Sequence, residues 1–145
     1  MRFFFAVDQI KKLCIVFCVC LTGCTGIPET VTPVDKFKIE KYLGKWYEIA
    51  RLDHSFERGL SHVTAMYTLR DDGGIDVINR GYDAQKGKWK EARGKAYFVN
   101  ASNLGYLKVS FFGPFYGAYV IFGLDRENYR YSLVCGPDTS YLWIL

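Results

Sequence analysis

The chain has 145 residues, which suits a single domain, and half of them are hydrophobic, which is ample for a core. Aromatic residues make up 17%, a share that favours strands and apolar cavities. The net charge is +4, but residues 24–145 hold 16 basic and 14 acidic residues. This balanced surface lacks the basic footprint of a nucleic-acid-binding protein. We expect no nucleic-acid partner.

The cysteines are concentrated at the start of the chain. Four of the five, Cys14, Cys18, Cys20 and Cys24, lie in the first 24 residues, and Cys135 alone lies in the rest. No disulfide within the domain is therefore expected. The early cysteines sit in an apolar run without histidine or carboxylate neighbours, so neither a metal site nor a cofactor is expected.

Residues 1–23 have the pattern of a targeting segment. Arg2, Lys11 and Lys12 supply a basic start, and nine apolar residues run without a break from Leu13 to Leu21. A transmembrane helix needs about 20 apolar residues, whereas the core of a signal peptide needs about 7–15. The pattern predicts a signal peptide.

The segment ends in Leu21-Thr22-Gly23-Cys24, which resembles the bacterial lipobox. The resemblance implies that Cys24 becomes the lipidated N-terminus and anchors the chain to a membrane. Thr25 stands where an Asp often retains such lipoproteins in the inner membrane, so the outer membrane, at its periplasmic face, is the expected location. Residues 24–34 are then the lipidated cysteine and a tether. An ordinary secretory signal, with Cys24 as a spare thiol, is the alternative.

The domain is expected over residues 35–145, beginning with a short helix at Lys36–Leu43. Asp35 is its expected cap, and Gly44 ends it. Eight runs with strand-like patterns follow, separated by turn signals such as Asp71–Gly74. Their spacing predicts an all-β fold, an eight-stranded up-and-down antiparallel β-barrel that can hold one small ligand. The runs are Lys45–Asp53, His62–Arg70, Ile75–Gly81, Trp89–Phe98, Tyr106–Phe112, Ala118–Leu124, Tyr129–Cys135 and Tyr141–Leu145.

Several motifs resemble the lipocalin family. Gly44, Trp46 and Tyr47 are similar to its first motif, and Asp125 with Tyr129 to its second. The stretches 108–117 and 135–145 resemble the bacterial outer-membrane lipoproteins of that family. The likeness covers about residues 24–145 and implies the lipocalin barrel, with Trp46 as a structural residue at its closed end.

The resemblance also implies a longer C-terminus than this chain has. Lipocalins continue past the eighth strand with an Arg over the motif Trp, a helix and a further strand. Here the chain ends at Leu145 in an apolar run. The expectation is a C-terminally truncated chain, with its last strand cut short, its C-terminal helix absent, its closure in question and apolar surface left bare.

Lipocalins of this kind bind apolar lipids, so the resemblance implies fatty acids or lysophospholipids as ligands, for storage or transport in cell-envelope maintenance. Inward positions on the strands are the expected lining, although a slip of one residue exchanges the two faces of a strand. Asn79 either bonds a ligand head group or a neighbouring strand. The expected lining residues are Val63, Ala65, Val77, Asn79, Ala96, Phe98, Val109, Phe111, Val120, Phe122 and Trp143.

The loop after the first strand carries a group of charged residues. Arg51, His54, Glu57 and Arg58 could form a lip at the barrel mouth or a partner surface, but a solvated loop is the default. Glu48 is expected either to face inward or, preferably, to pair with a basic residue.

Two other classes of function stay open. An enzyme would need Cys135 as nucleophile, but no histidine lies near it in sequence and no triad is readable, so the chain is not expected to be an enzyme. A buried Cys is more often a small hydrophobe. An anchored interaction module with an incidental cavity is the other alternative. The aromatic stretch Phe111–Gly117 would then contact a membrane or a second subunit, as in a homodimer.

Overall fold

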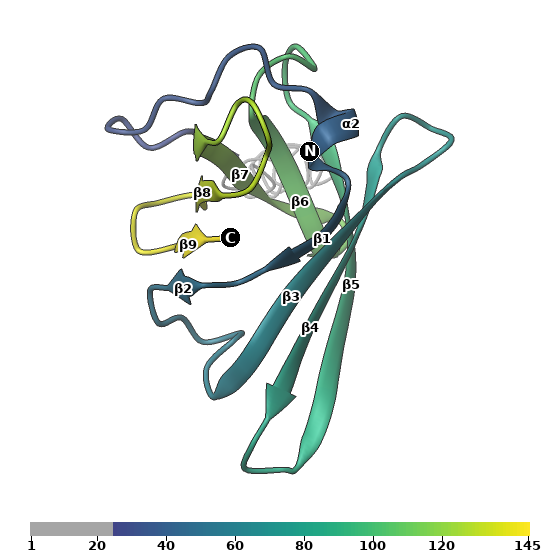
Figure 1. The fold of residues 1–145 in the computed structure, drawn as a ribbon, viewed down its shortest axis with the longest axis vertical. Coiled ribbons are helices and arrows are strands. Elements are labelled where there is room, and N and C mark those ends of the chain that lie inside the picture. The colour runs from purple at the N-terminus through teal and green to yellow at the C-terminus, as the bar shows by residue number, and fades with distance from the viewer. Residues whose placement is uncertain (1–24) are drawn as a thin grey trace, which may run out of the picture.

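The computed structural model describes residues 25–145 (Figure 1). The expected signal peptide and the lipidation site at Cys24 lie outside the described residues. Among the residues that the structure describes, no helix is long and apolar enough to cross a membrane.

Within residues 25–145 the structure contains one short α-helix, α2 (Ile39–Tyr42), and nine strands. The strands agree closely with the expected runs, except that the first run is divided in two. They are β1 (Gly44–Tyr47), β2 (Ala50–Arg51), β3 (Leu60–Leu69), β4 (Ile75–Asp83), β5 (Lys88–Phe98), β6 (Tyr106–Phe112), β7 (Phe115–Leu124), β8 (Ser132–Cys135) and β9 (Leu142–Ile144).

All nine strands form one curled antiparallel sheet in the order β1-β3-β4-β5-β6-β7-β8-β9-β2. The two ends of this order, β1 and β2, are the halves of the expected first strand. The halves pair with opposite ends of the sheet, since Trp46 of β1 faces Ala65 of β3, and Arg51 of β2 faces Trp143 of β9. The predicted all-β, up-and-down antiparallel architecture is confirmed (Figure 1).

The helix is shorter than expected, and Asp35 does not cap it. Its N-cap is Lys38, which makes no side-chain capping bond. Asp35 instead forms an ion pair of 2.5 Å with Arg126, and the hydrogen bond from that guanidinium lowers the pKa of Asp35. The helix cannot extend back to Asp35 because Lys36 has a positive φ of 52°.

The helix closes one end of the curled sheet. Gly44 follows it with φ 103°, a conformation that other residues rarely adopt. The next inward residue, Trp46, is buried and donates its indole N–H to the carbonyl of Tyr42 at 2.8 Å. The Tyr42 and Trp46 rings lie 4.6 Å apart between centroids. Trp46 therefore packs against the helix in the core.

A second apolar cluster lies on the other face of β7 and β8. Val120 and Cys135 are fully buried there, with Ile27 and Val31 of the N-terminal segment packed against them. The backbone N–H of Val34 also donates to the carbonyl of Ile121 at 2.9 Å. The segment that precedes the helix thus covers the outer face of these strands.

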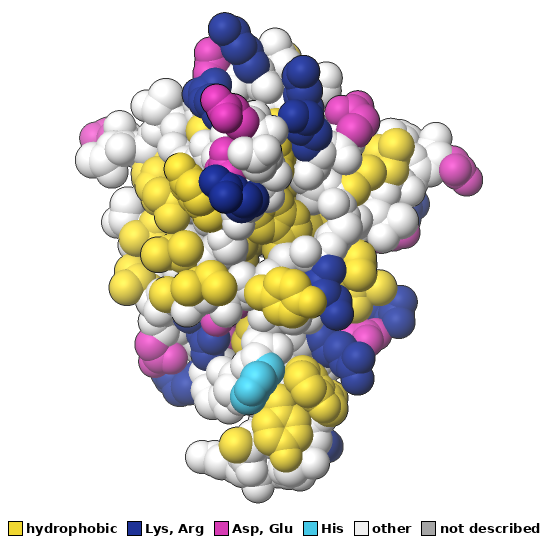
Figure 2. Space-filling model, viewed as in Figure 1, with side chains coloured by type: hydrophobic (Ala, Val, Ile, Leu, Met, Phe, Trp, Pro, Cys, Tyr) yellow, Lys and Arg dark blue, Asp and Glu magenta, His cyan; other side chains and the backbone are white. Residues whose placement is uncertain are grey.

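Apolar side chains are exposed over β1, β2 and β9. Figure 2 shows hydrophobic side chains gathered across the middle of this face. Ile49 is 74% exposed, and Tyr47 and Ile144 are also exposed. Apolar surface therefore lies exposed beside β9 in the part of the chain that the structure describes.

Candidate ligand-binding cavity

The concave face of the sheet encloses a cavity of about 780 Å³. Cavities of roughly 300–1,000 Å³ that are mostly apolar are typical of small-molecule binding sites. The wall is built from inward positions on β3 to β6, including Val63, Val77, Ala96 and Val109. Their alternation with outward polar residues gives each strand one apolar face.

Eight of the eleven residues expected to line the cavity do lie along it. Phe98 does not, because it packs at the closed end, where its ring centroid lies 6.2 Å from that of Phe37. The eight are Val63, Ala65, Val77, Asn79, Ala96, Val109, Phe111 and Trp143. Contact of these residues with a ligand stays a prediction.

The phase expected for β7 is wrong. Val120 and Phe122 face the second cluster on the outside of the sheet, and Tyr119 faces the cavity. The strand is apolar on both faces because the N-terminal segment covers its outer one, so its sequence shows no alternation from which the phase could be read. A register shift between Ile121 and Gly123 further disturbs the regular pairing with β8.

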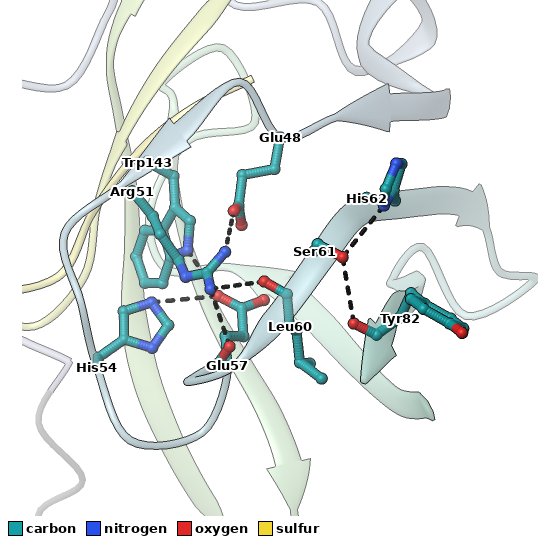
Figure 3. A network of polar contacts seen from close by, with 9 residues as sticks. All are labelled: Glu48, Arg51, His54, Glu57, Leu60, Ser61, His62, Tyr82 and Trp143. Atoms are coloured by element: carbon teal, nitrogen blue, oxygen red, sulfur yellow. Dashed lines mark hydrogen bonds and ion pairs between the residues drawn. The ribbon is translucent and has the colours of Figure 1, made fainter. Parts of the chain in front are cut away.

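Figure 3 shows a network of charged residues, two of which, Glu48 and Glu57, line the cavity. Arg51 forms an ion pair with Glu48 and donates from Nη2 to the carbonyls of Glu57 and Leu60 at 2.9 and 3.0 Å. Glu48 thus pairs with a basic residue, as expected, and it lines the cavity as well. Arg51 holds the loop between β2 and β3 against its own strand.

The carboxylate of Glu57 is the centre of this network. Its Oε2 accepts the indole N–H of Trp143 at 3.0 Å and lies 3.1 Å from Nε2 of His54 (Figure 3). The His54–Glu57 contact has the distance of an ion pair but not the angle of a hydrogen bond, and neither ring nitrogen of His54 has a hydrogen-bond partner in residues 25–145. The expected solvated loop is therefore wrong here, since each of these loop residues is only 5% exposed.

Burial controls the ionisation of the network. It raises the pKa of Glu57 and of Glu48, and the hydrogen bonds from Trp143 and Arg51 offset part of that increase. Burial, together with the charge of Arg51, lowers the pKa of His54. The local environment thus favours the uncharged forms of Glu48, Glu57 and His54.

The outer part of the same loop is solvated, as expected. Arg58 pairs with Asp53 at 2.9 Å, and both side chains are 64% exposed. Such an exposed ion pair contributes little to stability.

Three exposed phenylalanines line part of the cavity. Phe56, Phe112 and Phe115 all line it and are 57%, 82% and 64% exposed. The ring of Phe56 stacks on His54 at 4.1 Å between centroids. The aromatic stretch 111–117 is therefore exposed at its tip.

The floor of the cavity carries tyrosine hydroxyls that the sequence analysis did not single out. Tyr42, Tyr67 and Tyr119 line the cavity from α2, β3 and β7. The hydroxyl of Tyr119 bonds those of Tyr42 and Tyr67 at 2.9 and 2.7 Å. Tyr67 shares the phase of Val63, so the alternation of β3 indicates that it faces inward, but its hydrogen-bond partner Tyr119 lies 52 residues away.

Two further candidate residues have clear positions. Cys135 is fully buried and lies outside the cavity, where burial raises the pKa of its thiol. Asn79 lines the cavity, and its Oδ1 has no hydrogen-bond partner within the described part of the chain. Residues 25–145 contain no group of three His, Cys, Asp or Glu residues that could hold a metal ion.

An antiparallel sheet curled around one apolar cavity, with a helix over its closed end, defines a small-molecule-binding barrel. Residues 37–145 match the Lipocalin-like domain family, and the chain belongs to it. It is 66% identical over 137 residues to "Outer membrane lipoprotein Blc" of Vibrio cholerae, covering 94% of this chain and 80% of that protein. The protein of the same name from Escherichia coli K12 is 62% identical over 118 residues, which are 81% of this chain and 66% of the relative.

A solved structure supports the fold. Insecticyanin from the tobacco hornworm Manduca sexta superposes with a TM-score of 0.64 over 82% of this chain and 68% of that chain. At 20% sequence identity, the likeness concerns the fold alone.

Proposed function

We propose that the protein binds an apolar lipid, a fatty acid or a lysophospholipid, in the cavity and stores or transports it in cell-envelope maintenance. The observation that carries the proposal is the 780 Å³ cavity with an aliphatic wall. Each methylene transferred from water into such a wall contributes about 0.8 kcal/mol. Membership of the lipocalin family and the names of the relatives point to a binding protein rather than an enzyme.

The proposal includes a lipid anchor at Cys24 and a location at the outer membrane. The relatives from Vibrio cholerae and Escherichia coli are named as outer membrane lipoproteins, and the lipobox of this chain supports the same anchor. Two or more acyl chains give stable membrane attachment. An anchored barrel would then meet its ligands at the membrane surface.

A Cys135-dependent enzyme finds no support in this geometry. The thiol is buried outside the cavity, and its raised pKa disfavours the reactive thiolate at neutral pH. The anchored interaction module differs from the binding hypothesis in one measurable respect, because it requires no ligand in the cavity.

The test is a tryptophan-fluorescence titration of the chain with a fatty acid and, separately, a lysophospholipid. Trp143 lines the cavity and reports its occupancy. The matched variant is Ala96→Phe, which fills the cavity from a buried wall position. We expect saturable binding at micromolar or lower concentration and at least a tenfold loss in the variant. Absence of binding to any apolar ligand would refute the proposal and leave the interaction module.

A further inference from the structure

Four hydroxyl groups lie in one chain at the floor of the cavity, three of them on buried residues and one on the half-buried Tyr119. Ser132 Oγ lies 3.1 Å from the hydroxyl of Tyr42, which lies 2.9 Å from that of Tyr119, which lies 2.7 Å from that of Tyr67. Within residues 25–145 these hydroxyls make no other hydrogen bond. This row of four hydroxyls thus contains four O–H donors but only three hydrogen bonds.

The direction of donation along the row of hydroxyls follows from its buried end, Ser132. Ser132 is fully buried, and Tyr42 is its one side-chain partner among the described residues. Buried hydroxyl donors are rarely left without an acceptor, so Ser132 donates to Tyr42. Tyr42 then donates to Tyr119.

One proton is left over at the other end. Either Tyr119 donates to Tyr67, which leaves the O–H of Tyr67 without an acceptor, or Tyr67 donates to Tyr119, which leaves the O–H of Tyr119 free. Both residues line the cavity, whereas Ser132 does not. Burial raises the pKa of both tyrosines well above the ordinary value, so both keep their protons at neutral pH.

We propose that Tyr67 and Tyr119 form a donor subsite that binds an uncharged oxygen acceptor, a hydroxyl or a carbonyl, on the buried end of a ligand chain. The proposal rests on the proposed function, since it assumes that an aliphatic chain enters the cavity. A carboxylate is a poor occupant because burying an unpaired charge is far more costly than burying a hydroxyl. The chemical class is therefore an acyl chain that is oxygenated at the end remote from its carboxylate.

The test compares two ligands of equal length, dodecanoic acid and 12-hydroxydodecanoic acid, and repeats the comparison with the pair that is two methylenes longer. Each ratio of affinities is measured by calorimetry in the wild-type chain, in Tyr67→Phe, in Tyr119→Phe and in the double variant. Tyr116→Phe is the control, because Tyr116 lines the cavity and takes no part in the hydroxyl chain. The ratio within one variant is independent of the fraction of folded protein.

We expect the wild type and Tyr116→Phe to bind the hydroxy acid within about threefold of its parent acid. In the double variant both donors of the proposed subsite are absent, and we expect a penalty of at least about fivefold relative to the parent. Equal ratios in the wild type and the double variant would overturn the subsite while leaving the proposed function intact. Failure of both parent acids to bind would overturn the proposed function and the subsite with it.

Discussion

The indole N–H of Trp143 donates to the carboxylate of Glu57 at 3.0 Å, across 86 residues of sequence. This bond joins β9 to the loop that follows β2. His54 and Phe56 add aromatic contacts, with centroids 5.0 and 6.3 Å from the Trp143 ring. The last strand therefore positions the loop that borders the cavity.

Trp143→Phe tests this connection. The substitution keeps an aromatic ring and removes the N–H donor, so Oε2 of Glu57 loses its hydrogen bond in a buried site. We expect a loss of about 1–3 kcal/mol in the free energy of unfolding, measured by urea denaturation. Amide hydrogen exchange in residues 53–59 should become faster.

Trp89→Phe is the matched control, because Trp89 is half exposed and does not line the cavity. The Trp89→Phe substitution should leave amide hydrogen exchange in residues 53–59 nearly unchanged. Equal protection of the loop in Trp143→Phe and in the wild type would contradict the assigned role of the bond.

Glu57→Gln tests the electrostatics of the network. Burial raises the pKa of Glu57 in the folded state, so the native chain binds more protons than the unfolded chain at intermediate pH. The contribution of Glu57 to the free energy of unfolding is fully present below the ordinary glutamate pKa. It is lost as the pH rises through the raised pKa of Glu57 in the folded state. Gln cannot titrate, so the variant should gain stability relative to the wild type as the pH is raised.

The measurement is urea denaturation of both proteins at several pH values from about 4.5 upward. A difference in stability that does not change with pH would show that Glu57 titrates as it does in the unfolded chain.

His54→Gln should have the opposite pH dependence. Burial and Arg51 lower the pKa of His54, so its neutral form stabilises the fold above the ordinary histidine pKa. That stability is lost as the pH falls through the lowered value. The wild type should therefore lose stability relative to His54→Gln on acidification below about pH 6.5, as followed by thermal melting in a pH series. A difference in stability between the two proteins that does not change with pH would exclude a lowered pKa of His54 in the folded state.

A pair of substitutions distinguishes the two faces of the sheet. Phe111 lines the cavity, whereas Phe122 packs in the outer cluster. We expect Phe111→Ala to weaken fatty-acid binding at least about tenfold. Phe122→Ala should lower the melting temperature without changing the affinity of the folded fraction. Weakened fatty-acid binding by the folded fraction of Phe122→Ala would restore the phase expected for β7 from the sequence.

Gly94→Ala tests the close approach of β5 and β6. A Cβ at Gly94 would lie 2.5 Å from the carbonyl oxygen of Ser110, so the backbone has to move. We expect a loss of about 1–3 kcal/mol in unfolding free energy, as for other overpacked sites. Gly117→Ala, where nothing lies within 4 Å of the added carbon, should be nearly neutral in the same denaturation assay. Equal effects would argue against the close approach.

The parts of the site that were predictable are those with a local signal. On β3 and β4 polar and apolar residues alternate, and the expected inward positions, such as Val63 and Val77, do line the cavity. On β7 both faces are apolar, because one meets the cavity and the other meets Ile27 and Val31, so the alternation is lost.

The long-range polar contacts of the site had no local signal. The partners in the Trp143–Glu57 bond and in the Tyr42–Tyr119 bond are 86 and 77 residues apart. Only the curling of the sheet brings each pair together. A charged loop is usually solvated, and here the burial of Glu57 depends on the strand that follows much later.

The central claim is that the cavity binds an aliphatic chain, and calorimetry with a homologous series of fatty acids tests it most directly. The account predicts that affinity rises about fourfold with each added methylene until the cavity is full. Binding should also show a negative heat-capacity change. An affinity that is independent of chain length, or no binding at all, would contradict the account.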